Sequence, residues 1–518
     1  MDYILALDAG TGSVRAVLFD LSGRQVGVAQ TEWTHKEDEK YPDSMDFDYQ
    51  QNWVIIKDCI RSLLKETDII PSDIRAISAT SMREGFVLYD ADGIEIWACA
   101  NVDARAAKEA AFLKAQEGNL EQMTYQLSGQ TFALSAIPRL LWLKNHEPRV
   151  YEKATTLTMI NDWILYKLSG ELHMDPSNGC TSGIFDIHNR SGSRAAALLC
   201  GIKSTFLPEI KEAGTVIGYV TKTTAASTGL AEGTPVLSGG GDAQMASVGV
   251  GAIDHEQTVI SGGSFWQQEV NINKPRVDTL GRIRVNCHAV PNLWQIETIA
   301  FSPGLVMRWF RDAFCTEEKA KALKSGRDPY EILEEKARNV PIGSNGIMPI
   351  FSNIMNFTSW RHASPSFINL SLDPQKSGKK ELFKSLQENA ALVTLGNLKL
   401  VEEETGFYPK EVIFTGGASK GKLWSQTLAD VLGVSVKVPV VKEAAALGTA
   451  LYAGVGVQLY SSISEAVKTV KWERIHLPNM TNHKQYLHIY QQWLAIYNEQ
   501  LRLADNGLTK HMWKAPGV

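Results

Sequence analysis

Residues 3–19 read Tyr3-Ile-Leu-Ala-Leu-Asp-Ala-Gly-Thr-Gly-Ser-Val-Arg-Ala-Val-Leu-Phe19, and this stretch decides the fold. Two apolar, β-prone runs flank a turn rich in Gly, Thr and Ser, a pattern that predicts a β-hairpin. Such a turn can offer backbone N–H groups and hydroxyls to a phosphate, although an ordinary hairpin turn has the same pattern. Asp8 is placed to hold a cation through water. The candidate phosphate ligands in the turn are Gly10, Thr11, Gly12 and Ser13.

The length of the chain indicates more than one domain. At 518 residues it exceeds what one hydrophobic core usually serves, so we expect two domains, residues 1–250 and 251–518. An apolar content of 44% and a charged content of 21% are typical of a globular protein. A net charge of -5 gives no support to a nucleic-acid or membrane-surface partner, because either favours an excess of Lys and Arg.

Cysteine usage and the N-terminal segment both favour a cytoplasmic protein. No CxxC pair is present, which fits reduced core thiols better than disulfides or zinc. The N-terminus enters a strand at once, and no run of about 18 apolar residues follows, so we expect no signal peptide and no membrane span. The six cysteines are Cys59, Cys99, Cys180, Cys200, Cys287 and Cys315.

Helix and strand signals alternate along the chain, which predicts an α/β fold. Apolar residues recur at helical spacing over residues 48–66, and residues 74–80 are predicted to form a buried strand. A hairpin turning at residues 90–93 then leads to Asn101 and Asp103. Because open sheets carry binding sites at strand ends, polar residues in these places are candidate ligands of a substrate.

Two glycine-rich passages lie near the middle of the chain. Residues 236–242 predict a strand that runs into three glycines and Asp242, and residues 258–270 predict a strand, a glycine turn and a second strand. The second passage resembles the opening hairpin. We therefore expect two domains of related architecture that each offer a phosphate loop to one cleft, with the boundary at residues 249–255.

A third glycine passage, residues 412–423, nearly matches the P-loop pattern GxxxxGK[ST]. The last position argues against a P-loop, because Leu423 has no hydroxyl for Mg²⁺. A better interpretation is that Gly416, Gly417 and Ala418 let the base and ribose of a nucleotide lie against the backbone. Residues 443–454 predict a helix with a face of small residues, which suits close helix packing.

Taken in order, these motifs resemble those of the FGGY carbohydrate kinases. The resemblance runs from residue 3 to about residue 455 and implies two actin-like, hexokinase-like (ribonuclease H-like) α/β domains with an ATP cleft between them. It also implies ATP-dependent phosphorylation of an alcohol. The motifs are Asp8-x-Gly-Thr-x-Ser-x-Arg15, Gly241-Asp242, Gly416-Gly-Ala with Gln426 and Ala429-Asp430, and Ala446-Leu-Gly448.

Phosphoryl transfer to a hydroxyl needs a carboxylate aimed at the proton and cations aimed at the phosphoryl group. Asp242 follows three glycines at a strand end and matches the family's catalytic aspartate, so it is the expected base. Asp8 matches the metal-site aspartate, and we expect both near Mg²⁺. The expected phosphate ligands are Thr11, Gly12, Ser13, Arg15, Gly263 and Ser264. The expected contacts to the rest of the nucleotide are Gly304, Arg308, Gly416, Gly417 and Ala418.

Two of these nucleotide positions depart from the family pattern. Ser264 stands where many relatives carry Thr, which keeps the hydroxyl. Arg308 stands where glycerol kinases carry an amide, which puts its role in doubt.

For the acceptor, Arg83 and Glu84 match the pair that holds polyol hydroxyls in glycerol kinases. An Arg–Glu pair supplies donors and acceptors together, although it is also common as a surface ion pair. Trp266 is predicted either to wall the substrate pocket or to belong to the core. The other candidates for acceptor contacts are Asn101, Asp103 and Phe265.

Longer stretches resemble one member of the family. That resemblance implies that the acceptor is an open-chain quorum signal, (S)-4,5-dihydroxypentane-2,3-dione, phosphorylated at its C5 hydroxyl. It also suggests regulation by the phosphotransferase carrier HPr, whereas the oligomeric state is not readable from the sequence. Two alternatives stay open: a kinase for xylulose, ribulose or erythritol, and a non-catalytic actin-like regulator, against which Asp242 argues. The stretches are residues 81–85, 97–106, 133–142, 307–315, 365–370 and 513–517.

Overall fold

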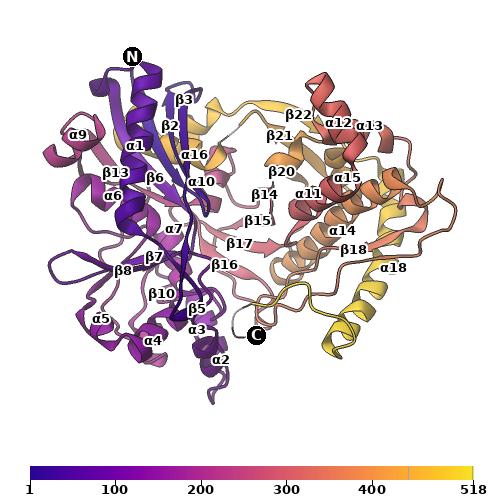
Figure 1. The fold of residues 1–518 in the computed structure, drawn as a ribbon, viewed down its shortest axis with the longest axis horizontal. Helices are drawn as coiled ribbons and strands as arrows, with labels where there is room; N and C mark the ends of the chain where they lie inside the picture. The colour runs from indigo at the N-terminus through magenta and orange to yellow at the C-terminus, as the bar shows by residue number, and fades with distance from the viewer. Residues whose placement is uncertain (442, 516, 518) are drawn as a thin grey trace.

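The computed structural model describes residues 1–441, 443–515 and 517 and contains two lobes (Figure 1). The first half of the chain builds most of one lobe, and the second half builds most of the other. Of the stretches singled out in the sequence, only Pro516 lies outside the described residues.

The first lobe is built on a six-stranded sheet with the order β12-β13-β6-β1-β2-β3. The opening hairpin is confirmed: β1 pairs antiparallel with β2, and Asp8 lies opposite Arg15. Strands β6 and β13 continue the sheet in parallel with β1. The strands are β1 (Tyr3–Ala9), β2 (Ser13–Asp20), β3 (Gln25–Glu32), β6 (Ile74–Ser81), β12 (Val216–Tyr219) and β13 (Pro235–Gly241).

The second lobe repeats this plan in a seven-stranded sheet with the order β16-β17-β15-β14-β20-β21-β22. The predicted second hairpin is the antiparallel pair β14 and β15, and β20 and β21 follow β14 in parallel. The predicted relation between the two hairpins is therefore confirmed at the level of topology. The strands are β14 (Thr258–Gly262), β15 (Trp266–Ile272), β16 (Arg284–Cys287), β17 (Trp294–Ile299), β20 (Glu411–Thr415), β21 (Ser435–Pro439) and β22 (Trp472–His476).

A five-stranded sheet with the order β4-β5-β8-β7-β9 extends the first lobe. The hairpin predicted to turn at residues 90–93 is its central pair, β7 and β8, and the chain leaves β8 toward Asn101. The strands are β4 (Lys36–Asp38), β5 (Tyr41–Asp46), β7 (Phe86–Tyr89), β8 (Glu95–Cys99) and β9 (Thr156–Met159). Two short pairs complete the strands: β10 (Phe185–Asp186) with β11 (Ser191–Gly192), and β18 (Met348–Ile350) with β19 (Ser366–Ile368).

The helix predicted over about residues 48–66 is α1, which begins after Asp48, whose carboxylate accepts from the Gln51 N–H. The helices are α1 (Tyr49–Thr67), α2 (Ala107–Lys114), α3 (Leu120–Ser128), α4 (Ala136–His146), α5 (Pro148–Lys153), α6 (Ile160–Ser169), α7 (Pro176–Gly179), α8 (Arg194–Leu199), α9 (Lys222–Thr228), α10 (Asp242–Gly249), α11 (Pro303–Phe314), α12 (Thr316–Ser325), α13 (Pro329–Ala337), α14 (Lys379–Thr405), α15 (Lys422–Leu432), α16 (Ala444–Gly456), α17 (Ile463–Ala466) and α18 (Met480–Asp505).

Two further expectations concern the core and membranes. All six cysteines are free and buried, as predicted. Within the described ranges, no helix is both long and apolar enough to span a membrane.

The lobes are joined by the crossing of α10 and α16. Helix α16 follows β21 of the second sheet but packs on β1, β6 and β13 of the first sheet (Figure 1). A Cβ atom on Gly448 of α16 would lie 1.9 Å from the carbonyl oxygen of Met245 in α10. The predicted small-residue face is therefore a packing surface that lets two helix backbones touch.

We expect Gly448→Ala to lower the free energy of unfolding by about 1–3 kcal/mol, because the added methyl overpacks this crossing. Helix propensity alone predicts the opposite sign, a gain of about 1 kcal/mol from replacing glycine. Urea denaturation followed by circular dichroism separates the two, and a more stable variant would contradict the close crossing.

Candidate active site

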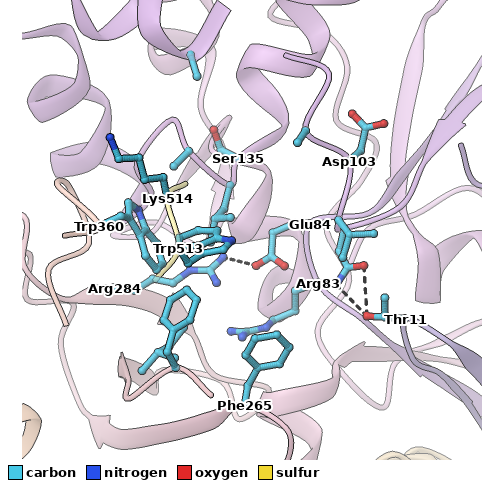
Figure 2. A pocket seen from close by; sticks show the side chains of 18 of the residues that line it. Thr11, Arg83, Glu84, Asp103, Ser135, Phe265, Arg284, Trp360, Trp513 and Lys514 are labelled. Atoms are coloured by element: carbon cyan, nitrogen blue, oxygen red, sulfur yellow. Dashed lines mark hydrogen bonds and ion pairs between the residues drawn. The ribbon is translucent and has the colours of Figure 1, made fainter. Parts of the chain in front are cut away.

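A cavity of about 740 Å³ lies between the lobes and is lined from both (Figure 2). The first lobe contributes Arg83, Glu84 and Asp242, and the second contributes Arg284 and Glu297. Arg284 and Glu297 belong to β16 and β17, Asp242 directly follows β13, and Arg83 and Glu84 lie two and three residues beyond the end of β6, so both sheets position the charged groups.

Asp242 begins α10 directly after β13, and its side chain is half-buried. Removal from water raises the pKa of Asp242 to about 6, and the carboxylates of Glu84 and Glu297 add to the rise. The guanidinium of Arg83 opposes it, with Nε 3.6 Å from Asp242 Oδ1. A carboxylate with a pKa this close to neutrality suits a general base.

Asp8 lies in β1 and is buried. Burial raises its pKa to about 7, and the carboxylates of Asp242 and Glu443 contribute, whereas Arg15 lowers it. Arg15 Nη1 lies 3.5 Å from Asp8 and 3.6 Å from Glu443, so its guanidinium is shared between two carboxylates.

The donor set fits a divalent cation. Asp8 and Asp242 are neighbouring carboxylates whose ionised forms are disfavoured by burial, and a cation would stabilise both. No group of three or more His, Cys, Asp or Glu that could hold a metal occurs among residues 1–441, 443–515 and 517. A cation bound here would therefore take most of its ligands from water and phosphate, which is the usual manner of Mg²⁺.

The turn of the first hairpin has the form of an anion site. Trp33 Nε1 donates to the carbonyl oxygens of Gly10 and Thr11, and the Trp33 N–H donates to the carbonyl oxygen of Gly12. In the described part of the chain, the N–H groups of Thr11 and Gly12 have no hydrogen-bond partner. Thr11, Gly12 and Ser13 thus form a turn with fixed carbonyls and available donors.

Three glycine-containing segments meet on the second lobe. A Cβ atom on Gly304 would lie 2.0 Å from the carbonyl oxygen of Gly263, and one on Gly416 would lie 2.7 Å from that of Gly262. Gly416 also has φ +83°, a conformation that favours glycine. The second hairpin turn, the start of α11 and the turn after β20 therefore touch through their backbones, whereas a Cβ on Gly417 would meet open space.

The remaining predicted nucleotide residues border this glycine cluster. Ser264 is exposed in the turn, and its carbonyl oxygen accepts from the Leu305 N–H. Ala418 is half-buried against Gly262. Arg308 lies one turn beyond Gly304 on the exposed side of α11.

The structure explains why the glycine passage at residues 416–423 is not a P-loop. The N–H groups of Leu423 and Trp424, at the start of α15, donate to the carboxylate of Glu334 at 3.1 and 3.2 Å. An acidic side chain at a helix N-terminus occupies the place where a P-loop holds phosphate. Residues 416–423 are therefore not available as a P-loop.

Arg83 and Glu84 each pair with a residue of the opposite lobe. Nη1 and Nη2 of Arg83 both donate to the Glu297 carboxylate, and Arg284 Nη2 lies 2.6 Å from Glu84 Oε1. Glu84 has φ +65°, which is uncommon for a residue other than glycine and is held by these contacts. The predicted Arg–Glu pair is thus two buried ion pairs between the lobes and not one surface pair.

Sequence reasoning missed Arg284 and Glu297. Gln130 Oε1 accepts from Arg284 Nε at 2.7 Å, and Asn286 Nδ2 donates to Glu297 at 2.9 Å, so the charged pair sits in a buried polar network. The available signal was one charged residue in each of two short strands that also contain Val, Cys, Trp and Ile, since buried charges are rare unless paired.

The two weaker candidates for acceptor contacts, Asn101 and Asp103, make different hydrogen bonds. Asn101 lines the cavity, and its Nδ2 donates to Thr11 Oγ1 at 3.0 Å. Asp103 lines the cavity, but its Oδ2 accepts from the Met45 N–H and from Arg105.

The prediction that Trp266 walls the pocket is wrong. Trp266 is fully buried, stacks on Trp424 at 5.1 Å and donates from Nε1 to Thr394. The neighbouring Phe265 stands in the turn just before β15, where it is exposed and lines the cavity instead.

Comparison with known proteins identifies this class of fold and site. The chain matches the FGGY family of carbohydrate kinases, N-terminal domain, over residues 3–249 and the C-terminal domain over residues 279–457. The protein belongs to the FGGY family of carbohydrate kinases, and its fold is therefore the one that the motifs predict.

Individual relatives are more specific. The chain is 51% identical over 518 residues to "Autoinducer-2 kinase" of Salmonella paratyphi B, covering all of this chain and 98% of the relative. It is equally 51% identical, with the same coverage, to "Autoinducer-2 kinase" of Escherichia coli K12. The crystal structure of xylulose kinase from Rhodospirillum rubrum superposes with a TM-score of 0.84 at 23% identity, covering 96% of this chain and 98% of that chain.

The raised pKa of Asp242 predicts a pH profile. A base must be ionised to accept a proton, and the protonated form of Asp242 persists up to a pH of about 6. We expect kcat/KM for the acceptor to fall as pH decreases through about 6 and to level off above the raised pKa, because this ratio reports the free enzyme. A profile that is flat between about pH 5 and 8 would contradict the role of Asp242.

Proposed function

We propose that this protein is an ATP-dependent kinase that phosphorylates autoinducer-2, as open-chain (S)-4,5-dihydroxypentane-2,3-dione, on its C5 hydroxyl. The 51% identity to autoinducer-2 kinases carries the proposal, because it extends over the whole chain and so includes every wall of the cavity. ATP as the phosphoryl donor follows from the family.

The reaction begins with the C5 hydroxyl directed at Asp242. The Asp242 carboxylate accepts the hydroxyl proton, while the hydroxyl oxygen forms a bond to the γ-phosphorus of ATP. The bond from that phosphorus to the bridging oxygen breaks, and ADP leaves with the electron pair. Arg83, 3.6 Å from Asp242, aligns the carboxylate.

The other residues bind and orient the substrates. Thr11, Gly12 and Ser13 donate to phosphate from the first lobe, and Gly263 and Ser264 do so from the second. Glu84 and Arg284 form a pair that can accept from and donate to the vicinal diol and its neighbouring carbonyl.

Further assignments complete the proposal. Mg²⁺ near Asp8 and Asp242 would neutralise charge on the phosphates. The base and ribose of the nucleotide lie against the backbone of Gly304, Gly416, Gly417 and Ala418. Arg308 lies at the edge of this surface.

We also propose that residues 1–250 and 251–518 act as two domains that close on the substrates. Dependence on cellular ATP places this activity in the cytoplasm. HPr as a regulatory partner rests on the family resemblance alone.

A coupled ADP-release assay with the dione, xylulose, ribulose, glycerol and erythritol tests the substrate. We expect kcat/KM for the dione to exceed that for each other acceptor by at least about tenfold. Asp242→Ala should lower kcat by about 10²–10⁴, whereas Asp92→Ala, in the exposed turn between β7 and β8, should leave it unchanged.

If kcat/KM is highest for a ketopentose or a polyol, that compound and not the dione is the acceptor. ADP release that no acceptor stimulates would favour the regulator. Activity that survives Asp242→Ala would remove the assigned base.

A further inference from the structure

The residues that follow α18 return to the cavity between the lobes. Figure 1 shows the chain after α18 running from the second lobe back toward the space between the two lobes. His511 Nδ1 lies 2.8 Å from the carbonyl oxygen of His362, and a Cβ on Gly517 would lie 2.6 Å from Ala110 in α2. The segment therefore crosses from the second lobe to the first. The match to the FGGY C-terminal domain ends at residue 457. The roles assigned so far to the nucleotide-binding residues and to the catalytic base do not involve the segment after α18.

Trp513 of this segment forms part of the cavity wall. Its ring lies 4.7 Å from that of Phe301 and 5.3 Å from that of Trp360, and all three side chains line the cavity. Figure 2 shows Trp360 and Trp513 together on one side, with Arg83 and Thr11 toward the other. We call the side formed by Phe301, Trp360 and Trp513 the aromatic end of the cavity. Arg284 and Lys514 also lie near this end, and Phe265 lies near Arg83.

Two residues of the aromatic end have unusual backbones. Phe301 has φ +63° and Trp360 has φ +45°, conformations that are rare for bulky side chains. Such conformations persist only where surrounding contacts hold them, and they cluster at functional sites. Both rings pack into the cluster that also contains Ala515, so the C-terminal segment helps to hold them.

Trp360 also carries an unused donor. It is 3% exposed, and its Nε1 has no hydrogen-bond partner among the described residues. The ring of Trp360 lines the cavity, and a buried N–H without a partner costs free energy until an acceptor atom reaches it. A carbonyl oxygen attached to an apolar group would satisfy both the donor and the aromatic surface.

From this geometry we propose that Phe301, Trp360 and Trp513 form a subsite for the methyl ketone end of the acceptor, closed by the C-terminal segment 511–515. The inference rests on the proposed function, since the dione has a diol at one end and a methyl ketone at the other. With the diol at Asp242, Arg83 and Glu84, the methyl ketone faces the aromatic end. A hydroxymethyl ketone at this end would bury a hydroxyl against aromatic carbon, so the subsite selects against it.

Calorimetric titration in the presence of a non-hydrolysable ATP analogue tests the subsite without requiring turnover. The ligands are the dione and a matched pair, 1-deoxy-D-xylulose and D-xylulose, which differ only by the hydroxyl on C1. We expect the wild type to bind the 1-deoxy compound about 10–100-fold more tightly. Trp513→Ala should weaken binding of the dione at least about tenfold and reduce the preference within the pair, whereas Trp513→Phe should retain most of both.

Trp472→Ala is the matched control, because Trp472 is 40% exposed on β22 and does not line the cavity. It should leave all three dissociation constants unchanged. Thermal unfolding checks that the Trp513 variants fold. If Trp513→Ala does not fold, the subsite is tested by the preference of the wild type for 1-deoxy-D-xylulose over D-xylulose and by the binding constants of Trp513→Phe.

Equal binding of the two pentoses by the wild type, or an unchanged dione constant in a folded Trp513→Ala, would overturn the subsite. If neither pentose binds, the subsite is tested by the change in the dissociation constant of the dione in Trp513→Ala. A preserved pentose preference without phosphorylation of the dione would instead refute the proposed function and leave the subsite standing.

Discussion

The two ion pairs between the lobes, Arg83 with Glu297 and Glu84 with Arg284, are the constraint on which the acceptor site depends. Each joins a residue that lies two or three positions beyond the end of β6 to a strand of the second sheet. All four side chains are buried or nearly so, and removing one partner of such a pair typically costs about 3–5 kcal/mol. The positions of these four charged side chains in the acceptor site therefore depend on contacts between the lobes.

These pairs also explain the protonation of the site. Glu297 lies beside two guanidinium groups, which hold its pKa at about 2 despite burial. Glu269, buried nearby without such a partner, has its pKa raised to about 8, and that of Asp242 is raised to about 6. The site thus holds one permanently ionised carboxylate, Glu297, for structure. The pKa values of Asp242, Asp8 and Glu269 all lie near neutrality, and of these three Asp242 is the one assigned to proton transfer.

Much of the fold could be predicted because its signals are local. Glycine turns between apolar runs identified both hairpins. The missing hydroxyl at Leu423 argued against a P-loop, and the structure adds that the Glu334 carboxylate occupies the start of α15. Phe265 and Trp266 are adjacent aromatic residues at the end of a turn and the start of β15, so composition alone could not decide which of them faces the cavity. Arg284 and Glu297 were missed because their partners lie 200 and 214 residues away in the chain. The contribution of Trp513 depends likewise on where the chain returns after α18.

A double-mutant cycle on Glu84 and Arg284 tests the central claim most directly. Glu84→Gln, Arg284→Met and the double variant are compared with the wild type by kcat/KM for the acceptor. If the contact between the lobes positions the acceptor, the two effects are coupled by at least about 1.5 kcal/mol, and the double variant loses little more than either single one. Effects that add to within about 0.5 kcal/mol would show that the two residues act independently and would contradict the account.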